Sequence, residues 1–175
     1  AGTADTPPFH IPLAVGLVGA DGRDLPLRLA GEPAPGAGTR VLDVTQRAHT
    51  FVFEDVAAPP VPSLLRDFSA PVIVEHAYTD AQLAFLMSHD SDPFNRWEAA
   101  QRLAQAAVVA ALRSDAHAAA LRDTLTAAFA RVLDDASLDP DGRAIRRLLP
   151  LERTKVYDMR KVLECVFDRG SMLEL

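Results

Sequence analysis

The fold class turns on one stretch, SHDSDPFNRWEAAQRLA, which spans residues 88–104. It places His89 and Asp90 side by side between two serines, and these are the residue types of hydrolytic sites. Local chemistry favours the start of a helix instead. Asp92 can accept hydrogen bonds from the free N–H groups of a first turn, and Pro93 suits the first helical position, where no N–H is needed. A catalytic triad is defined by spatial geometry and not by adjacency in sequence. We therefore predict a capped helix here and no triad.

The residues after Pro93 continue the helical pattern to about Arg113. Alanines fill the gaps in a row of residues that recurs every three or four positions: Phe94, Trp97, Gln101, Ala104, Val108 and Leu112. Two neighbouring segments show the same spacing. Thr79 can cap a helix with Leu83, Leu86 and Met87 on one face, and residues 117–135 carry a stripe of Leu121, Leu125, Phe129 and Val132. The spacing of apolar residues over 154–169 predicts a further helix.

Residues 9–78 show the alternation of β-strands instead. Apolar side chains alternate over residues 9–18, and the Asp-Gly pair of ADGR, residues 20–23, indicates a tight hairpin turn. The return strand DLPLRL contains Pro26, which places it at a sheet edge. We expect RVLDVTQR to pair with HTFVFEDV, residues 57–71 to form a proline-rich crossing, and VIVEHAY, residues 72–78, to form a last strand.

Strands come first and helices afterwards, so the order predicts separate domains and not an alternating β/α fold. We place the boundary near residue 79. Residues 1–78 are expected to form a β domain, and residues 79–175 a helical one, with an uncertain tail from about residue 141. No internal repeat is evident in the sequence.

Composition excludes several classes of protein. The 175 residues carry a net charge of −6, and the arginines lie among acids, so no basic stripe predicts nucleic-acid binding. No apolar run is long enough to span a membrane, and the N-terminus lacks the features of a signal peptide. The single cysteine, Cys165, excludes an intrachain disulfide and fits a reducing compartment. We expect a cytoplasmic protein. The missing initiator methionine suggests a fragment or a processed chain.

No catalytic, cofactor-binding or metal-ligating residue can be assigned from the motifs. The five histidines do not form a His-Glu-x-x-His motif, and His10 and His76 are expected in strands. The glycines of GLVGADG, residues 16–22, precede no helix and no Lys-Ser/Thr pair, so a hairpin explains them better than a phosphate loop. Cys165 lies on an apolar helical face and is interpreted as a structural thiol.

Three long segments resemble consecutive parts of bacterial aminopeptidase N, a zinc aminopeptidase of the gluzincin type. They are PFHIPLAVGLVGADGRDLPL, RVLDVTQRAHTFVFEDVAAPPVPSLLRDFSAPV and YTDAQLAFLMSHDSDPFNRWEAAQRLA. The resemblance is detailed from about Pro8 to about Gln105, continues weakly through LTAAFARVLDDASLDP, and is not seen from about Asp141 onward.

The resemblance implies an immunoglobulin-like β-sandwich, without its first strands, followed by the start of an α-solenoid-like helical domain. It implies zinc and peptide substrates for the parent enzyme, and the rest of the same polypeptide as the partner of this region. The family's Gly-x-Met-Glu-Asn loop and His-Glu-x-x-His helix do not occur here. No catalytic residue is therefore carried over, and the chain itself is expected to be inactive and without a cofactor. We also expect no nucleic-acid or membrane partner.

Two other hypotheses stay open at this point. A sandwich followed by helices could act as a stand-alone module that binds another protein, which would need a complete sandwich. A small enzyme built around His89 would need a pocket with titratable groups whose pKa values are perturbed.

Overall fold

The structure, a computed structural model, describes residues 8–114 and 116–135. Five strands and a short 3-10 helix come first, and three α-helices follow, which confirms the predicted order of β and then α structure. The chain folds as two compact units. Of the described residues, 8–76 and Asp90–Asp92 form the sheet unit, and Ala77–His89 and those from Pro93 to Asp135 form the helical unit.

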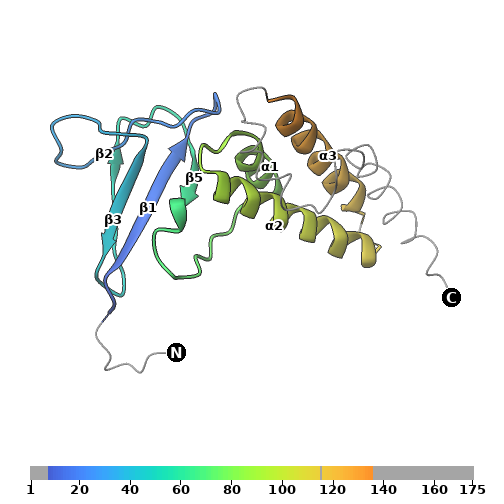
Figure 1. The fold of residues 1–175 in the computed structure, drawn as a ribbon, viewed down its shortest axis with the longest axis horizontal. Coiled ribbons are helices and arrows are strands. Elements are labelled where there is room, and N and C mark those ends of the chain that lie inside the picture. Colours follow the sequence, from blue (N-terminus) through green and yellow to red (C-terminus); the bar gives the residue numbers. More distant parts are fainter. Residues whose placement is uncertain (1–7, 115, 136–175) are drawn as a thin grey trace. The chain divides into compact units, whose positions relative to one another are not determined.

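Strand β1 (Ile11–Val18) is the centre of the sheet unit, as the alternation over residues 9–18 predicted. It lies between β3 (Thr39–Val44) and β5 (Val61–Leu64) in an antiparallel three-stranded sheet (Figure 1). Ile11 is opposite Val44, and Val15 is opposite Leu64. Strand β3 pairs with the first six residues of β1 and β5 with the last four, so β1 has a strand on both edges only at Val15 and Gly16.

The Asp-Gly turn after β1 is confirmed. The N–H of Gly22 donates to the carbonyl of Gly19 at 2.9 Å, and Gly22 has a φ of 80°, which glycine adopts without steric cost. The return segment is shorter than predicted. After a bridge between Val18 and Asp24 it leaves this sheet and forms β2 (Arg28–Leu29), which pairs with β4 (Phe53–Glu54) in a second sheet.

Three strand predictions were wrong. Strand β3 pairs with β1, and β4 pairs with β2, so the expected pairing of RVLDVTQR with HTFVFEDV does not occur. The proline-rich crossing contains β5, which lies at the edge of its sheet, where Pro62 needs no ladder N–H. The described residues 72–78 contain no strand. Although Ile73 is apolar, it is 94% exposed in the described structure.

The helical unit begins with α1 (Asp80–His89), and Thr79 caps it as predicted. The Gln82 N–H donates to Thr79 Oγ1 at 3.2 Å, and the Thr79 N–H donates to Gln82 Oε1 at 2.9 Å, which is the reciprocal pattern of a capping box. Leu83, Leu86 and Met87 are buried on one face, also as predicted.

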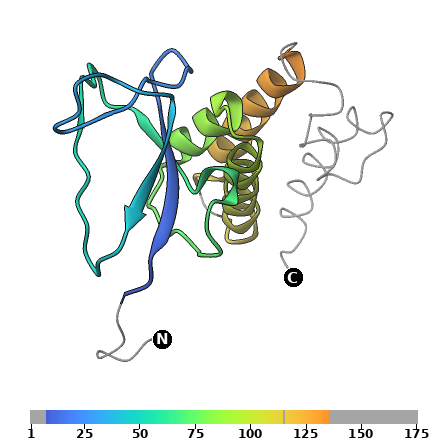
Figure 2. The same cartoon turned by 60° about the vertical axis from the view of Figure 1, so that its left-hand side comes forward.

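Helices α2 (Pro93–Leu112) and α3 (Ala118–Asp134) complete this unit, and each of the three helices packs against the other two (Figure 2). The buried face of α2 differs from the predicted row, since Leu112 is 69% exposed. The face that is buried is Asn95, Arg96, Ala99, Leu103, Ala107 and Ala110. Its small alanines allow neighbouring helices to approach closely. The predicted helix at residues 154–169 and Cys165 lie outside the described residues.

Candidate functional site

The succession of His89, Asp90 and Ser91 does not form a triad. His89 ends α1, and its ring lies against Phe85 with the ring centroids 4.8 Å apart. Ser91 donates a hydrogen bond from Oγ to the carboxylate of Asp24 at 2.6 Å. The hydroxyl that a nucleophile would need therefore serves a contact in the sheet unit. Helix α2 begins at Pro93, as predicted, and the capping role of Asp92 stays a prediction.

His89 belongs to the helical unit, and its surroundings there disfavour a positive charge. Partial burial lowers the pKa of His89, and the nearby guanidinium groups of Arg131 and Arg96 lower it further, against an opposing effect of Asp135. The imidazole is therefore more readily neutral than in a free histidine. Arg96 has a structural role of its own. It donates from Nη2 to the carbonyl of Ser88 at 2.8 Å, so its positive charge faces the C-terminal end of α1.

The most highly organised polar site is a buried arginine in the sheet unit. Arg66 is 2% exposed, and all three nitrogens of its guanidinium donate hydrogen bonds. We call Arg66 and its side-chain partners the Arg66 cluster. The hydrogen bonds run from Nε to Ser63 Oγ (2.8 Å), from Nη1 to Asp24 Oδ2 (2.8 Å) and Thr39 Oγ1 (2.9 Å), and from Nη2 to Asp24 Oδ1 (2.7 Å) and Asp90 Oδ1 (3.1 Å). Two parallel bonds to one carboxylate are the strongest arrangement an arginine makes.

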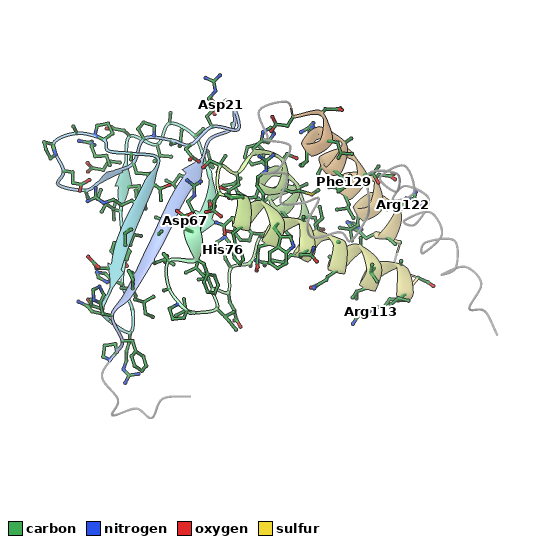
Figure 3. The ribbon with its side chains drawn as sticks, in the orientation of Figure 1. Asp21, Asp67, His76, Arg113, Arg122 and Phe129 are labelled. Carbon is green, nitrogen blue, oxygen red and sulfur yellow. The ribbon has the colours of Figure 1, made fainter. Side chains whose placement is uncertain are left out.

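An unusual backbone positions Arg66. It begins the 3-10 helix η1 (Arg66–Phe68), which is separated from β5 by Leu65 alone. Leu65, Asp67 and Phe68 have φ angles of 60°, 53° and 52°. Left-handed backbone costs an ordinary residue about 1–2 kcal/mol. Such strain persists only where the surroundings over-determine the conformation. One contact that holds this turn is the Asp67 N–H, which donates to Asp92 Oδ2 at 2.8 Å; Figure 3 labels Asp67.

Two glycines make room for the cluster. A Cβ built at Gly16 would overlap the guanidinium of Arg66, so this arginine lies directly on the backbone of β1. A Cβ built at Gly38 would come 2.7 Å from Cβ of Asp24. Gly16 was read from the sequence as one of the glycines that lead into the hairpin. The structure gives it a second role, because only glycine leaves this space open.

The pKa values of the two acidic partners of Arg66 are shifted in opposite directions. Burial raises the pKa of the Asp24 carboxyl, but hydrogen bonds from Arg66 and Ser91 outweigh burial and hold it below its usual range. Asp90 is fully buried, and this desolvation raises its pKa despite hydrogen bonds and the charge of Arg66. The other carboxylate oxygen of Asp90, Oδ2, is buried without a hydrogen-bond partner among the described residues. The pKa of Arg66 is raised, since bonding to Asp24 and nearby carboxylates outweighs its burial.

Sequence reasoning did not find this cluster. Its members come from the turn after β1, from β3, from the end of β5 and from the segment before α2, and no local pattern joins them. One signal was present. Arg66 follows Leu64 and Leu65 in a stretch otherwise rich in apolar residues and proline, and an arginine in such a stretch needs an acidic partner if it is buried.

The described residues do not fit a metal centre. No group of three or more His, Cys, Asp and Glu side chains comes together within residues 8–114 and 116–135. His10 was expected in a strand, but it lies one residue before β1, at the surface, where it pairs with Asp43 at 2.6 Å. His49 stacks on Phe51 with ring centroids 4.3 Å apart. None of the helices in the described part of the chain has the length and apolar character that a membrane crossing requires.

Two domain families match the chain in succession. Residues 1–77 match the family described as "Domain of unknown function (DUF3458) Ig-like fold", and residues 80–166 match "Domain of unknown function (DUF3458_C) ARM repeats". The second match extends past residue 141, where the resemblance read from the sequence stopped. An Ig-like domain followed by a helical domain is the fold class that the resemblance implied, although the sequence itself shows no evident repeat.

Several known relatives are aminopeptidases. The chain is 40% identical to aminopeptidase N of Escherichia coli K12 over 160 residues, which is 89% of this chain and 18% of that protein. It is 32% identical to aminopeptidase N of Caulobacter vibrioides over 79% of this chain and 15% of that protein. A solved structure, Legionella pneumophila aminopeptidase A in complex with aspartic acid, aligns with a TM-score of 0.56 and 28% identity over 74% of this chain and 14% of that chain.

The chain thus spans less than a fifth of the length of these relatives. Within that span, both domain matches, the sequence identities and the order of strands before helices agree. The chain therefore belongs to the bacterial aminopeptidase N family, of which it carries the Ig-like domain and the ARM-repeat domain that follows it.

Proposed function

We propose that this chain is a non-catalytic, structural region of a zinc-dependent aminopeptidase that removes N-terminal residues from peptides. The observation that carries the proposal is the 40% identity to an aminopeptidase N over 160 residues, through both domains in order. The proposed partners are the rest of the same polypeptide and, for the parent enzyme, its peptide substrates. Location in the cytoplasm stays a prediction from the sequence.

The use of the polar residues supports a structural role. Asp90 and Ser91, which a triad would require, are bound to Arg66 and Asp24 in the sheet unit. His89 contacts Phe85 in the helical unit. The described side chains also offer no set of three or more ligands for zinc. The chemistry of the parent is proposed to lie elsewhere in its polypeptide.

The test is an assay of the isolated 175-residue chain. We expect no stoichiometric zinc after dialysis and no hydrolysis of aminoacyl-anilides above a blank, because no paired histidine ligands exist in the sequence. Metal analysis and the anilide assay measure both, with a full-length aminopeptidase N as the positive control. One tightly held zinc per chain would contradict the proposal. A turnover that disappears in His89→Ala would revive the hypothesis of a small enzyme around that histidine.

A further inference from the structure

Three consecutive residues join α1 to α2 in sequence yet belong to the sheet unit. They are Asp90, Ser91 and Asp92, and we call them the acidic turn. Asp90 is fully buried, and Asp92 is 6% exposed. Two buried carboxylates in a connection between helices are unusual, because connections normally lie at the surface and charged groups stay in water. Buried carboxylates need hydrogen-bond partners inside the protein.

Each side chain of the acidic turn makes a hydrogen bond to an upstream part of the sheet unit. The contacts are Asp90 Oδ1 with Arg66 Nη2 (3.1 Å), Ser91 Oγ with Asp24 Oδ2 (2.6 Å), and Asp92 Oδ2 with the backbone N–H of Asp67 (2.8 Å). The turn also orders itself, since the Asp92 N–H donates to Asp90 Oδ1 at 3.0 Å. These contacts resemble the recognition of an acidic peptide by an arginine site.

The receptor side is built from residues upstream of the turn. The guanidinium of Arg66 is held by Ser63, Thr39 and both carboxylate oxygens of Asp24. One hydrogen bond from Nη2 is then left for Asp90. Gly16 lets the guanidinium lie against β1. The left-handed residues around Arg66 present the N–H of Asp67 to Asp92. Sequence positions 16–68 thus form a preorganised site for a turn that lies more than twenty residues further along the chain.

We propose that the sheet unit recognises the acidic turn as an intramolecular peptide ligand, with Arg66 as the receptor group. The Ig-like fold is then completed by residues 90–92, which lie outside the 1–77 match of its domain family. Without the turn, the N–H of Asp67 would lose its acceptor, and the strained backbone of η1 would lose a contact that holds it.

Hydrogen exchange of the 175-residue chain tests the proposal. In the double variant Asp90→Ala and Asp92→Ala, we expect amides of β1 and β5 to exchange about a hundredfold faster, since an N–H of Arg66 and the N–H of Asp67 would lose their acceptors inside the sheet unit. Amides of α3 should change by less than about threefold, because α3 belongs to the helical unit and the cluster to the sheet unit. The control is the exposed pair Asp80→Ala and Asp123→Ala, which should leave β1 unchanged. Unchanged protection of β1 in the first double variant would overturn the proposal.

A rescue experiment separates recognition from general destabilisation. A synthetic peptide of residues 86–95 is added to the Asp90→Ala and Asp92→Ala variant at about 5 mM, above the millimolar effective concentration of a short tether. We expect the peptide to restore protection of β1, and the same peptide with alanine at both acidic positions to have no effect. Equal action of the two peptides, or no action of either, would mean that the sheet unit does not recognise the turn.

Discussion

At the scale of single residues, Arg66 shows how a buried charge is accommodated. Taking a guanidinium out of water is costly, and only excellent geometry offsets the cost. Here a bidentate carboxylate, two hydroxyls and a second carboxylate supply that geometry. The arrangement also requires glycine at position 16, because any side chain there would displace the guanidinium. A residue without a side chain can therefore be as important for such a site as the residues whose side chains form its hydrogen bonds.

Gly16→Ala tests this requirement directly. The new methyl group would force Arg66 out of its position and leave the buried carboxylates of Asp24 and Asp90 without their partner. We expect the sheet unit to lose about 3–5 kcal/mol of stability, the usual cost of breaking a buried charge pair. Denaturant unfolding followed by β-sheet circular dichroism or exchange of β1 amides measures the loss.

The matched control for this change is Gly36→Ala. The nearest atom to a Cβ at Gly36 is 3.7 Å away, an ordinary van der Waals contact. We expect the free energy of unfolding to stay within about 0.5 kcal/mol of the parent, as for most surface substitutions. Equal losses for the two glycines would mean that Arg66 moves aside without cost, and that the cluster contributes little to stability.

At the scale of elements, the parts set by local chemistry were predictable. The capped start of α1, the start of α2 at Pro93 and the Asp-Gly turn depend on a few neighbouring residues, and all three were read correctly. Strand pairing depends on residues far apart in the chain. The sequence offers nothing local that selects β1, and not β4, as the partner of β3. The Arg66 cluster escaped prediction for the same reason.

The row of α2 residues that the helical spacing picked out, from Phe94 to Leu112, is not the row that the structure buries. The structure instead buries a row of alanines around Leu103, and the large Leu112 is exposed in the described structure. Alanine rows pack helices closely without a large apolar stripe.

Two leucines of α2 test which face is buried. Leu103 is 0% exposed, and we expect Leu103→Ala to lower the free energy of unfolding of the helical unit by about 2–5 kcal/mol. Leu112, in the same helix, is 69% exposed, and Leu112→Ala should cost less than about 0.5 kcal/mol. Thermal unfolding followed by helical circular dichroism compares the two. A larger loss of unfolding free energy for Leu112→Ala than for Leu103→Ala would mean that the row first read from the sequence is the buried one.

At the scale of the whole molecule, the chain consists of two units that depend on different interactions. Packing of three alanine-rich helices dominates the helical unit, and an ion cluster with three carboxylates near one arginine is central to the sheet unit. Acid should therefore act on the two units in different pH ranges. Each response follows from the direction of the pKa shifts within that unit.

In the helical unit, the pKa of His89 is lowered in the folded state, by burial first and then by Arg131 and Arg96. A lowered folded pKa means that the folded state binds the proton less tightly than the unfolded state. Its contribution to stability is therefore full above the unfolded pKa, near pH 6.5, and is lost as the pH falls through the folded pKa. The helical unit should weaken when the pH falls from about 7 to about 5.

In the sheet unit, the two acids act in opposite directions. The lowered pKa of Asp24 gives stability that is present above the unfolded pKa of 3.8 and is lost only as the pH falls through the lower, folded value. The raised pKa of Asp90 favours the folded state at low pH, and this contribution fades as the pH rises through its folded value. Acidification to about pH 5 stays above the range in which Asp24 titrates, and the shift of Asp90 favours the folded state as the pH falls, so the sheet unit should not weaken.

Amide exchange at a series of pH values, corrected for the intrinsic rate at each pH, distinguishes these responses. Between pH 7 and about pH 5 we expect protection in α1 and α3 to fall, while protection in β1 stays constant. His89→Gln should abolish the pH response of α1 and α3, because glutamine does not titrate. Arg131→Gln should reduce it, since Arg131 is the larger of the two positive influences on His89, whereas Arg122→Gln on the same helix should have no effect. Figure 3 labels Arg122 on α3. If β1 loses protection before α3 as the pH falls, the balance assigned to Asp24 and Asp90 is wrong.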